Sequence, residues 1–504
     1  MMKNNRKIER VFLLFPPVRM FRENPQQLLS PLGVSYIASV IRNDVDVKIM
    51  DAMIEEVNNK VDLDKDFVRY GASYKDILAQ IEAYKPDIVG ISCLWSTVAP
   101  VLRELTVEIK RLDKDILIMT GGSYPTFMVE QCMQEMPVDM IALGEGEITM
   151  LECIRHLRDG RALVDIDGLA YREGERIIIN QKTKWIENLD SVPFPARDLL
   201  PMDLYRRYGV PHSITASSHN SSPIVTSRGC PARCIYCSST SFWGNHYRFR
   251  SPENVLDEMG ELVNRWGIEE IQFEDDNMTA NRSRAKAIFQ GMIDRGYKIK
   301  FNFPNGIALW TLDEEMIDLM ANAGCYEMSL PFESGCQKVL REIIKKPTDL
   351  KKAREIAKII QAKGIRTTGF YIIGFPGETK EQMMETFRFA DEVKTDIGYF
   401  FVANPLPGTE LYQIAKERSM LRDDFSFENN TYTRSAYNDS VSPKGELERM
   451  VSLQFVKYSI RSFFRNPKVL MKVFFFDLLF KHPGKTLGLL IRVLKRYSPS
   501  IEKH

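Results

Sequence analysis

The sequence predicts an α/β protein with a doubly wound, Rossmann-like domain, then a partial (β/α)6 barrel, and then a helical C-terminal region. Three observations support this prediction. Short apolar runs alternate with helical stretches over the first 165 residues, the alternation returns after about residue 223, and the C-terminal residues are helical in pattern and strongly basic. Alternating strands and helices are typical of parallel sheets that are covered by helices.

The length of 504 residues allows about three domains. We expect four segments along the chain. They are a first domain over 1–165, a connector over 166–222, a barrel over 223–415 and a helical basic region over 416–504. Within the connector, Glu173-Gly174-Glu175 predicts a hairpin turn, and the three prolines of Leu189–Pro201 predict an extended strap.

The first domain carries five strand candidates with helical stretches between them. The strands are Arg10–Phe15, Val45–Met50, Asp87–Ser92, Ile116–Thr120 and Met140–Leu143. Ligands of doubly wound sheets bind past the carboxyl ends of the strands, where small residues let the backbone come close. The candidate ligand contacts are therefore the turn residues at these ends, Ser92, Gly121, Gly122, Gly144, Glu145 and Gly146.

The barrel carries six strand candidates. They are Ile224–Thr226, Ile268–Phe273, Lys300–Phe303, Tyr326–Leu330, Thr367–Ile373 and Gly398–Val402. Between the first two, Ser251-Pro252-Glu253 predicts a helix start, with serine as the N-cap and proline in the first position. The loops at the carboxyl ends of barrel strands build the functional site.

Three cysteines follow the first barrel strand directly. Cys230, Cys234 and Cys237 have the spacing C-x3-C-x2-C. Three thiolates on one loop can hold three irons of a four-iron cluster, and the fourth iron then keeps an open position for a reactant, as a catalytic zinc does. A structural zinc site commonly needs four ligands, and the sequence has no second pair of suitably spaced cysteines. Zinc binding and an incidental grouping are the alternatives.

Acidic residues follow the second barrel strand. Glu274, Asp275 and Asp276 stand at its carboxyl end, where a barrel places its site residues. Carboxylates at this position can accept hydrogen bonds from an ammonium group. The alternative is a helix N-cap or a solvated cluster of acids.

The cysteine segment SRGCPARCIYCSS, with Tyr236 before the last cysteine, is similar to the C-x3-C-x-aromatic-C signature of the radical S-adenosylmethionine (SAM) superfamily. The first domain resembles the cobalamin-binding domain that is fused ahead of many of these enzymes. Its matching segments are LLFPP, PLGVSYIASVI, KPDIVGIS, TGGSYPTF and ALGEGE. The resemblance covers about residues 10–415.

The resemblance implies three cofactors. They are a [4Fe-4S] cluster on the cysteines, SAM chelated by the open iron, and cobalamin on the first domain. It places Glu274, Asp275 or Asp276 against SAM or the substrate, and Glu333, in LPFESG, against the SAM ribose and methionine. Gly374, in GFPGE, is expected beside the adenine or, as an alternative, in a purely structural turn.

One departure from the cobalamin pattern concerns cobalt. Many cobalamin enzymes supply a histidine to cobalt from a D-x-H-x-x-G motif. The N-terminal half of this chain has no such motif, and its one histidine is His156. We therefore expect cobalamin to bind without a protein histidine on cobalt.

The resemblance implies methylation of an unactivated carbon, or of a phosphinate phosphorus, in a small-molecule or lipid substrate. One SAM would supply a 5′-deoxyadenosyl radical that removes hydrogen, methylcobalamin would supply the methyl group, and a second SAM would remethylate the cobalamin. An electron donor such as flavodoxin or ferredoxin is the expected partner. The alternatives are a non-methylating ring closure or oxidative rearrangement, a methylthiotransferase, for which no second cysteine triad is evident, and a non-catalytic cobalamin sensor.

The C-terminal region differs in charge from the rest of the chain. Residues 457–504 carry 11 Lys and Arg against two acids, and Phe474, Phe475, Phe476 and Phe480 lie among them. This pattern fits either a helical cap on the barrel or a segment that lies on an anionic membrane surface. No nucleic-acid-binding module is present. Dispersed cysteines and an N-terminal apolar run too short for a signal peptide favour a cytoplasmic location, with membrane association as an option.

Overall fold

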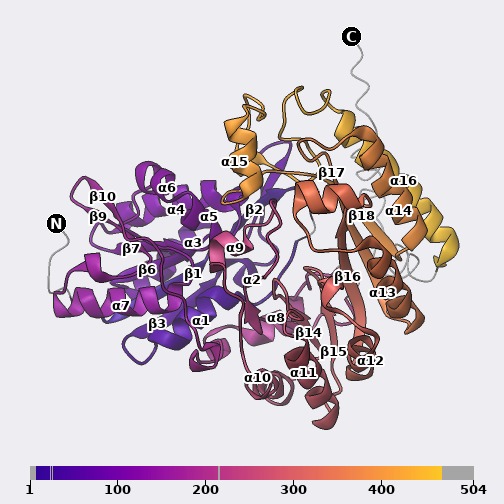
Figure 1. Ribbon diagram of the computed structural model, residues 1–504. Coiled ribbons are helices and arrows are strands. Elements are labelled where there is room, and N and C mark those ends of the chain that lie inside the picture. Colours follow the sequence, from indigo (N-terminus) through magenta and orange to yellow (C-terminus); the bar gives the residue numbers. More distant parts are fainter. Residues whose placement is uncertain (1–6, 23, 25, 214–215, 468–504) are drawn as a thin grey trace.

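The computed structural model describes residues 7–467 except 23, 25 and 214–215 (Figure 1). The first half of the chain forms one α/β unit, and the barrel lies beside it. Helix α16 (Glu446–Arg465) lies on the barrel side, and α15 (Glu410–Glu417) lies at the top of Figure 1, where the two units meet. Residues 468–504 of the predicted helical basic region, with Phe474, Phe475, Phe476 and Phe480, lie outside the described residues.

The first sheet has seven strands in the order β10-β9-β8-β7-β6-β1-β3. Its strands are β1 (Arg10–Phe15), β3 (Asp46–Asp51), β6 (Ile88–Ser92), β7 (Leu117–Gly121), β8 (Met140–Ala142), β9 (Leu169–Glu173) and β10 (Arg176–Ile179). The first five run parallel. Numbered from 1 to 5 along the chain, they lie across the sheet in the order 2-1-3-4-5, the flavodoxin-like arrangement. Such a sheet binds its ligand where the order reverses, which is here between β1 and β6. The predicted doubly wound sheet is confirmed.

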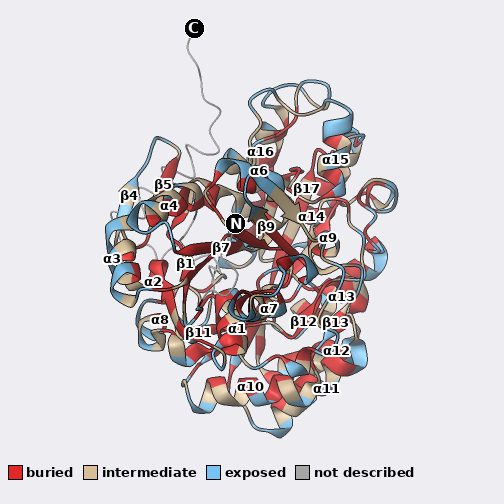
Figure 2. Cartoon of the chain, turned by 90° about the vertical axis from the view of Figure 1, so that its left-hand side faces the viewer, coloured by how far each residue is buried: buried red, intermediate tan, exposed pale blue. Residues whose placement is uncertain are grey.

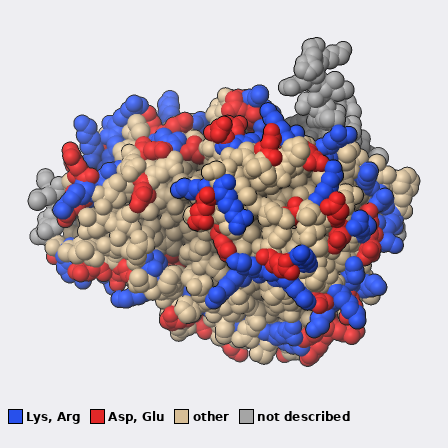
Figure 3. Space-filling model, turned by 45° about the horizontal axis from the view of Figure 1, so that its top comes forward, with Lys and Arg blue, Asp and Glu red and all other residues tan. Residues whose placement is uncertain are grey.

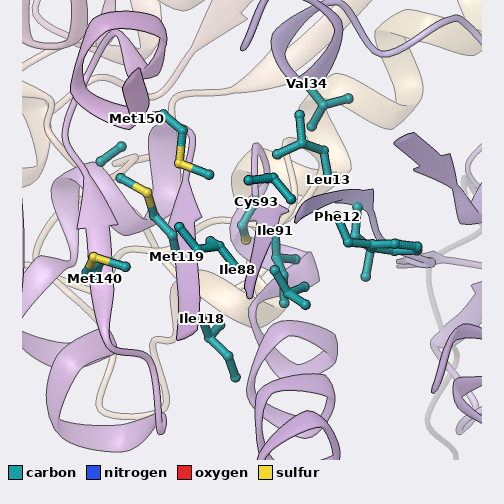
Figure 4. Packing of buried hydrophobic residues seen from close by; sticks show 14 of the residues in the cluster. Phe12, Leu13, Val34, Ile88, Ile91, Cys93, Ile118, Met119, Met140 and Met150 are labelled. Carbon is teal, nitrogen blue, oxygen red and sulfur yellow. The ribbon is translucent and has the colours of Figure 1, made fainter. Parts of the chain in front are cut away.

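Helices cover this sheet and bury it almost completely (Figure 2). They are α1 (Leu32–Ile41), α2 (Ala52–Glu55), α3 (Tyr74–Tyr84), α4 (Ala99–Leu112), α5 (Ser123–Phe127), α6 (Val129–Glu135) and α7 (Gly146–Asp159). Side chains from neighbouring strands, such as Leu13, Ile91 and Met119, gather with Met150 of α7 in a core that has no polar side chain among those drawn (Figure 4).

A second, three-stranded antiparallel sheet was not predicted. It consists of β2 (Val18–Phe21), β4 (Lys60–Asp62) and β5 (Phe67–Tyr70) in the order β2-β5-β4. Both outer strands have four residues or fewer, and alternation over so few residues is too weak to indicate a strand.

The barrel sheet has six strands in sequential order, and every neighbouring pair is parallel. The strands are β11 (Ser221–Ile224), β14 (Glu270–Phe273), β15 (Lys300–Phe303), β16 (Cys325–Glu333), β17 (Arg366–Ile373) and β18 (Ile397–Val402). The first and last strands do not pair, so the barrel is open, as predicted. Its helices are α10 (Pro252–Asn264), α11 (Arg282–Asp294), α12 (Glu314–Ala323), the π-helix Val339–Ile344, α13 (Leu350–Ala362) and α14 (Lys380–Val393).

The first barrel strand ends earlier than predicted. We expected it over Ile224–Thr226, but β11 stops at Ile224. The Thr226 backbone N–H donates to the Asp275 carboxylate at 3.0 Å instead of to a neighbouring strand, which ends the ladder. The chain then forms a separate two-stranded ladder, β12 (Ser227–Arg228) with β13 (Arg248–Phe249), and short helix α9 (Ser239–Trp243) lies in the loop between them.

The connector contributes to both units. Its predicted hairpin forms β9 and β10 and extends the first sheet with antiparallel pairing. The strap that follows leads to α8 (Met202–Tyr208) and is held to the barrel by a buried ion pair, Arg197–Glu258, at 2.7 Å. The domain boundaries proposed from the sequence stay a prediction.

The C-terminal helix α16 packs against β18 through Tyr458, whose hydroxyl donates to the Thr395 carbonyl at 2.9 Å. Its outer face exposes Leu453, Ile460 and Phe464. Within the described residues, no helix is both long enough and apolar enough to cross a bilayer.

Candidate active site

A cleft of about 1040 Å³ lies between the two sheets at the carboxyl ends of their strands. Its walls come from both units, which is where doubly wound sheets and barrels each place their ligands. All six turn residues predicted from the first domain line it: Ser92, Gly121, Gly122, Gly144, Glu145 and Gly146. The barrel contributes Glu274 and Asp276, together with Arg228 and Ser238 on either side of the cysteines.

The first-domain wall suits a large, flat, partly apolar cofactor. Gly122 has a φ of +105°, and a Cβ there would lie 2.6 Å from the Cys93 carbonyl oxygen, so a side chain cannot be accommodated. Beside these turns, Leu94 and Trp95 are 43% and 48% exposed and line the cleft. Apolar surface of this size beside small turn residues fits the face of a corrin ring.

No histidine of the first domain reaches the cleft. His156 lies in the last turn of α7, where its Nδ1 contacts the Ala162 carbonyl at 2.6 Å, and it is not among the lining residues. The cleft-lining histidine in the described part of the chain is His212, from the connector.

The cysteine loop runs from β12 to α9. Cys230 and Cys234 are half-buried and Cys237 is exposed. Burial raises the pKa of Cys234 to about 11, and coordination of a metal favours the thiolate form of a cysteine. No three His, Cys, Asp or Glu side chains in the described residues converge on a single ion position. The assignment of the three cysteines to a cluster stays a prediction based on their spacing.

The three consecutive acids after β14 point to different partners. Glu274 lines the cleft, where its carboxylate accepts from Asn305 Nδ2 at 2.6 Å and contacts His212 Nδ1 at 3.3 Å. Asp276 also lines the cleft. Asp275 does not: it is buried, and it accepts from the hydroxyls of Thr226 and Ser227 at 2.7 and 2.5 Å. Asp275 therefore holds the strand that precedes the cysteines.

Burial by itself lowers the pKa of His212, but the hydrogen bond and charge of Glu274 outweigh it and raise the pKa above the usual value. The pair thus presents a carboxylate and an imidazole with increased affinity for a proton to the cleft. No pattern in the sequence predicted this pair, because His212 lies in the connector, 62 residues before Glu274.

Glu333 ends β16 and is tied to the cysteine loop. Its Oε1 accepts from Tyr236 Oη at 2.7 Å and from Lys346 Nζ at 2.8 Å. Both Glu333 and Lys346 are 5% exposed. Burial lowers the pKa of Lys346, but the attraction of Glu333 outweighs this, and the pKa is raised. Lys346 was not predicted, because no motif in the neighbouring sequence marks this lysine as a site residue.

Gly374 makes a turn that does not line the cleft. Its φ is +83°, its N–H donates to Glu378 Oε2 at 2.7 Å, and a Cβ there would lie 2.6 Å from Leu447 Cδ1 of α16. Burial raises the pKa of Glu378 to about 7. The structural alternative for this turn has direct geometric support, and an adenine contact stays a prediction.

Glu145 is part of a buried ion-pair cluster that joins the two units. Its Oε1 contacts Arg228 at 2.7 Å and Arg248 at 2.6 Å, while Glu147 contacts Arg228 at 2.5 Å. All four side chains are at most 7% exposed. Arg228 stands two residues before Cys230, so this cluster connects the turn after β8 to the cysteine loop.

Two family models match the chain. The radical SAM superfamily model matches residues 224–390, and the B12 binding domain model matches residues 19–154. A cytidylyl-2-hydroxyethylphosphonate methyltransferase of Streptomyces wedmorensis is 32% identical over 86% of both chains. An uncharacterized methyltransferase of Pyrococcus horikoshii is 31% identical over 97% of this chain and 99% of its own.

The fold is similar to that of a solved protein. The cobalamin-dependent SAM radical enzyme OxsB, with aqua-cobalamin and SAM bound, superposes with a TM-score of 0.70 and 18% identity, over 98% of this chain and 76% of its own.

Prediction for the ion-pair cluster. Replacement Glu145→Gln leaves two buried guanidinium groups with a single carboxylate, and breaking a buried pair costs about 3–5 kcal/mol. We expect the free energy of unfolding, measured by urea titration, to fall by about that amount. Glu173→Gln, which removes a mostly exposed partner of Arg176, should cost less than about 1 kcal/mol. Equal losses in the two variants would contradict a special role for Glu145.

Prediction for cobalt. Because His156 lies outside the cleft and apolar side chains line the first-domain wall, the cob(II)alamin form should show no nitrogen superhyperfine splitting in its electron paramagnetic resonance (EPR) spectrum. Clear imidazole splitting in the wild type would refute the prediction. The spectrum of His212→Ala would then show whether His212 of the connector is the ligand.

Proposed function

The chain belongs to the cobalamin-dependent radical SAM enzymes, and on that premise we propose that it is a methyltransferase for an unactivated carbon, or a phosphinate phosphorus, of a small molecule or lipid. As a member of this family it uses a [4Fe-4S] cluster, SAM and cobalamin. When bound, these groups supply the hydrogen abstraction and the methyl donor, and the protein supplies position and protection from water.

One observation carries the proposal. The turns of the cobalamin-type domain and the residues beside the cysteine loop line a single cleft. A substrate held in this space is within reach of both cofactor sites. Methyl transfer requires this, because the hydrogen is removed and the methyl group is supplied by different cofactors. A sensor would need no such shared space. The Streptomyces relative, which covers most of the chain, is named for a methylation at a small phosphonate-containing molecule, which supports the same reaction class.

The residues in the cleft and those beside it each have a proposed task. Cys230, Cys234 and Cys237 hold the cluster, and Tyr236 with Lys346 holds Glu333 in place beside their loop. Asp276 lies on the same side of the cleft and suits the ammonium group of SAM. The donor set therefore fits SAM on the barrel side.

On the other side, the turns at Ser92, Gly121-Gly122 and Gly144–Gly146 bring backbone close to the cobalamin, while Leu94 and Trp95 cover apolar area. Between the two sides, Glu274 and Asn305 orient His212. We propose that the Glu274–His212 pair binds a polar substituent of the substrate. An electron donor such as flavodoxin or ferredoxin is proposed to reduce the cluster.

Prediction for the reaction. Protein reconstituted with iron, sulfide and cobalamin, then reduced under anaerobic conditions, should hold about four irons per chain and convert SAM to both 5′-deoxyadenosine and S-adenosylhomocysteine when given a substrate. Cytidylyl-2-hydroxyethylphosphonate is the first probe, and SAM with a deuterated methyl group reports transfer by mass spectrometry. A non-methylating enzyme forms only 5′-deoxyadenosine. If the triple Cys230→Ala, Cys234→Ala, Cys237→Ala variant still cleaves SAM, the cluster assignment is wrong.

We also propose peripheral membrane contact through residues 457–504. On the face seen in Figure 3, basic and acidic side chains are interspersed, whereas these residues carry a net charge of +9. The described end of this region exposes apolar side chains of α16, among them Ile460, Phe463 and Phe464, the last 79% exposed. Basic charge beside aromatic side chains suits an anionic lipid surface, where each cation contributes about 1 kcal/mol.

Prediction for the membrane. The intact protein should float with vesicles that contain anionic lipid at low salt and remain behind at high salt, because a lipid attraction of this kind is screened. Deletion of residues 468–504, which keeps α16, should abolish flotation while iron content stays unchanged. Neutral vesicles are the control. An intact protein that stays in the soluble fraction at low salt would show that residues 457–504 have no lipid affinity.

A further inference from the structure

We propose that Asn277 sets the reduction potential of the iron–sulfur cluster by donating a side-chain hydrogen bond to the sulfur of Cys230. The inference goes beyond the reaction class and rests on the proposed assignment of the three cysteines to the cluster. It concerns a residue that the sequence analysis did not single out.

The contact is well defined. Asn277 Nδ2 lies 3.5 Å from Cys230 Sγ, a normal separation for a bond to sulfur, whose radius is larger than that of oxygen. Asn277 is 2% exposed, so water cannot readily replace the donor. Its Oδ1 is also buried and has no hydrogen-bond partner in the described residues, so the contact with Cys230 is the side-chain hydrogen bond found for this amide in the described part of the chain.

Both ends of this contact are held by the same neighbouring bonds. Asp275, two residues before Asn277, binds the backbone and side chain of Thr226 and the hydroxyl of Ser227. Ser227 stands three residues before Cys230. The segment after β14 is therefore fastened to the start of the cysteine loop, and the amide is brought to the sulfur without depending on a long flexible side chain.

A second cysteine has a donor of a different kind. The Ser239 backbone N–H lies 3.5 Å from Cys237 Sγ. A backbone donor is present whatever the side chain, whereas the donor to Cys230 exists only with a suitable residue at position 277. Asn277 is thus a place at which a change of sequence can adjust the charge on the cluster sulfurs.

Reduction of the cluster adds one electron, which a one-electron reductant supplies, and no bond to the protein forms or breaks. The added negative charge is shared by the sulfurs. An N–H donor stabilises the reduced cluster more than the oxidised one, because charged acceptors form stronger hydrogen bonds. The amide of Asn277 therefore raises the reduction potential, so that an external donor reduces the cluster more readily, while the reduced cluster becomes a weaker reductant toward SAM.

The test is a redox titration of the reconstituted enzyme without SAM, monitored by the EPR signal of the reduced cluster. Asn277→Leu removes the donor at similar volume, and Asn277→Asp replaces it with an acceptor. Both should move the midpoint potential to more negative values than the wild type. Thr279→Val is the matched control, because Thr279 is buried in the same segment and bonds Thr311 instead of a cysteine.

An unchanged potential in Asn277→Leu would overturn the proposal, and so would an equal shift in Thr279→Val, which would indicate general loosening of the segment. If both Asn277 variants fail to assemble four irons while Thr279→Val succeeds, Asn277 is a structural residue and the proposal is also wrong. A wild-type protein without a four-iron cluster would instead refute the proposed function.

Discussion

The arrangement of the whole site depends on one buried group of charges, in which Glu145 and Glu147 meet Arg228 and Arg248. Charges taken out of water are costly unless they are paired and hydrogen-bonded, and here each is paired across the boundary between the two sheets. Any movement of one unit against the other must break these pairs. Because Arg228 lies two residues before Cys230, the cluster joins the turn after β8 directly to the cysteine loop. It acts together with the connector, which extends the first sheet and is tied to the barrel by Arg197–Glu258.

Local features of the site followed from the sequence, while the long-range contacts did not. Glycine and acid turns after apolar runs predicted which residues meet at the cleft, since strand ends in parallel sheets share one edge. Spacing says nothing about where a side chain points. Glu145 was expected to contact a ligand because it stands in such a turn, yet its carboxylate binds two arginines that are 83 and 103 residues away. His212, Lys346 and Asn277 were missed for the same reason.

The three consecutive acids after β14 have different surroundings and contacts. Glu274 orients an imidazole, Asp275 fastens the strand before the cysteines, and Asp276 faces the cleft. Asp275 matches neither structural alternative weighed from the sequence, since it is a buried acid that binds Thr226 and Ser227 and not a helix N-cap or a solvated acid. A ligand contact by Glu274 or Asp276 stays a prediction. At Gly374, the turn serves the packing of α16.

The close approach of Leu447 to Gly374, together with the bond of Tyr458 to Thr395, has a consequence for how such proteins can be recombined. Helix α16 packs against the barrel and covers part of its apolar core, although it lies outside the segment matched by the radical SAM model. A gene fusion or a shortened chain that ends soon after β18 would uncover apolar side chains of the barrel and invite aggregation. A fragment that keeps the barrel covered must therefore extend at least to Arg465.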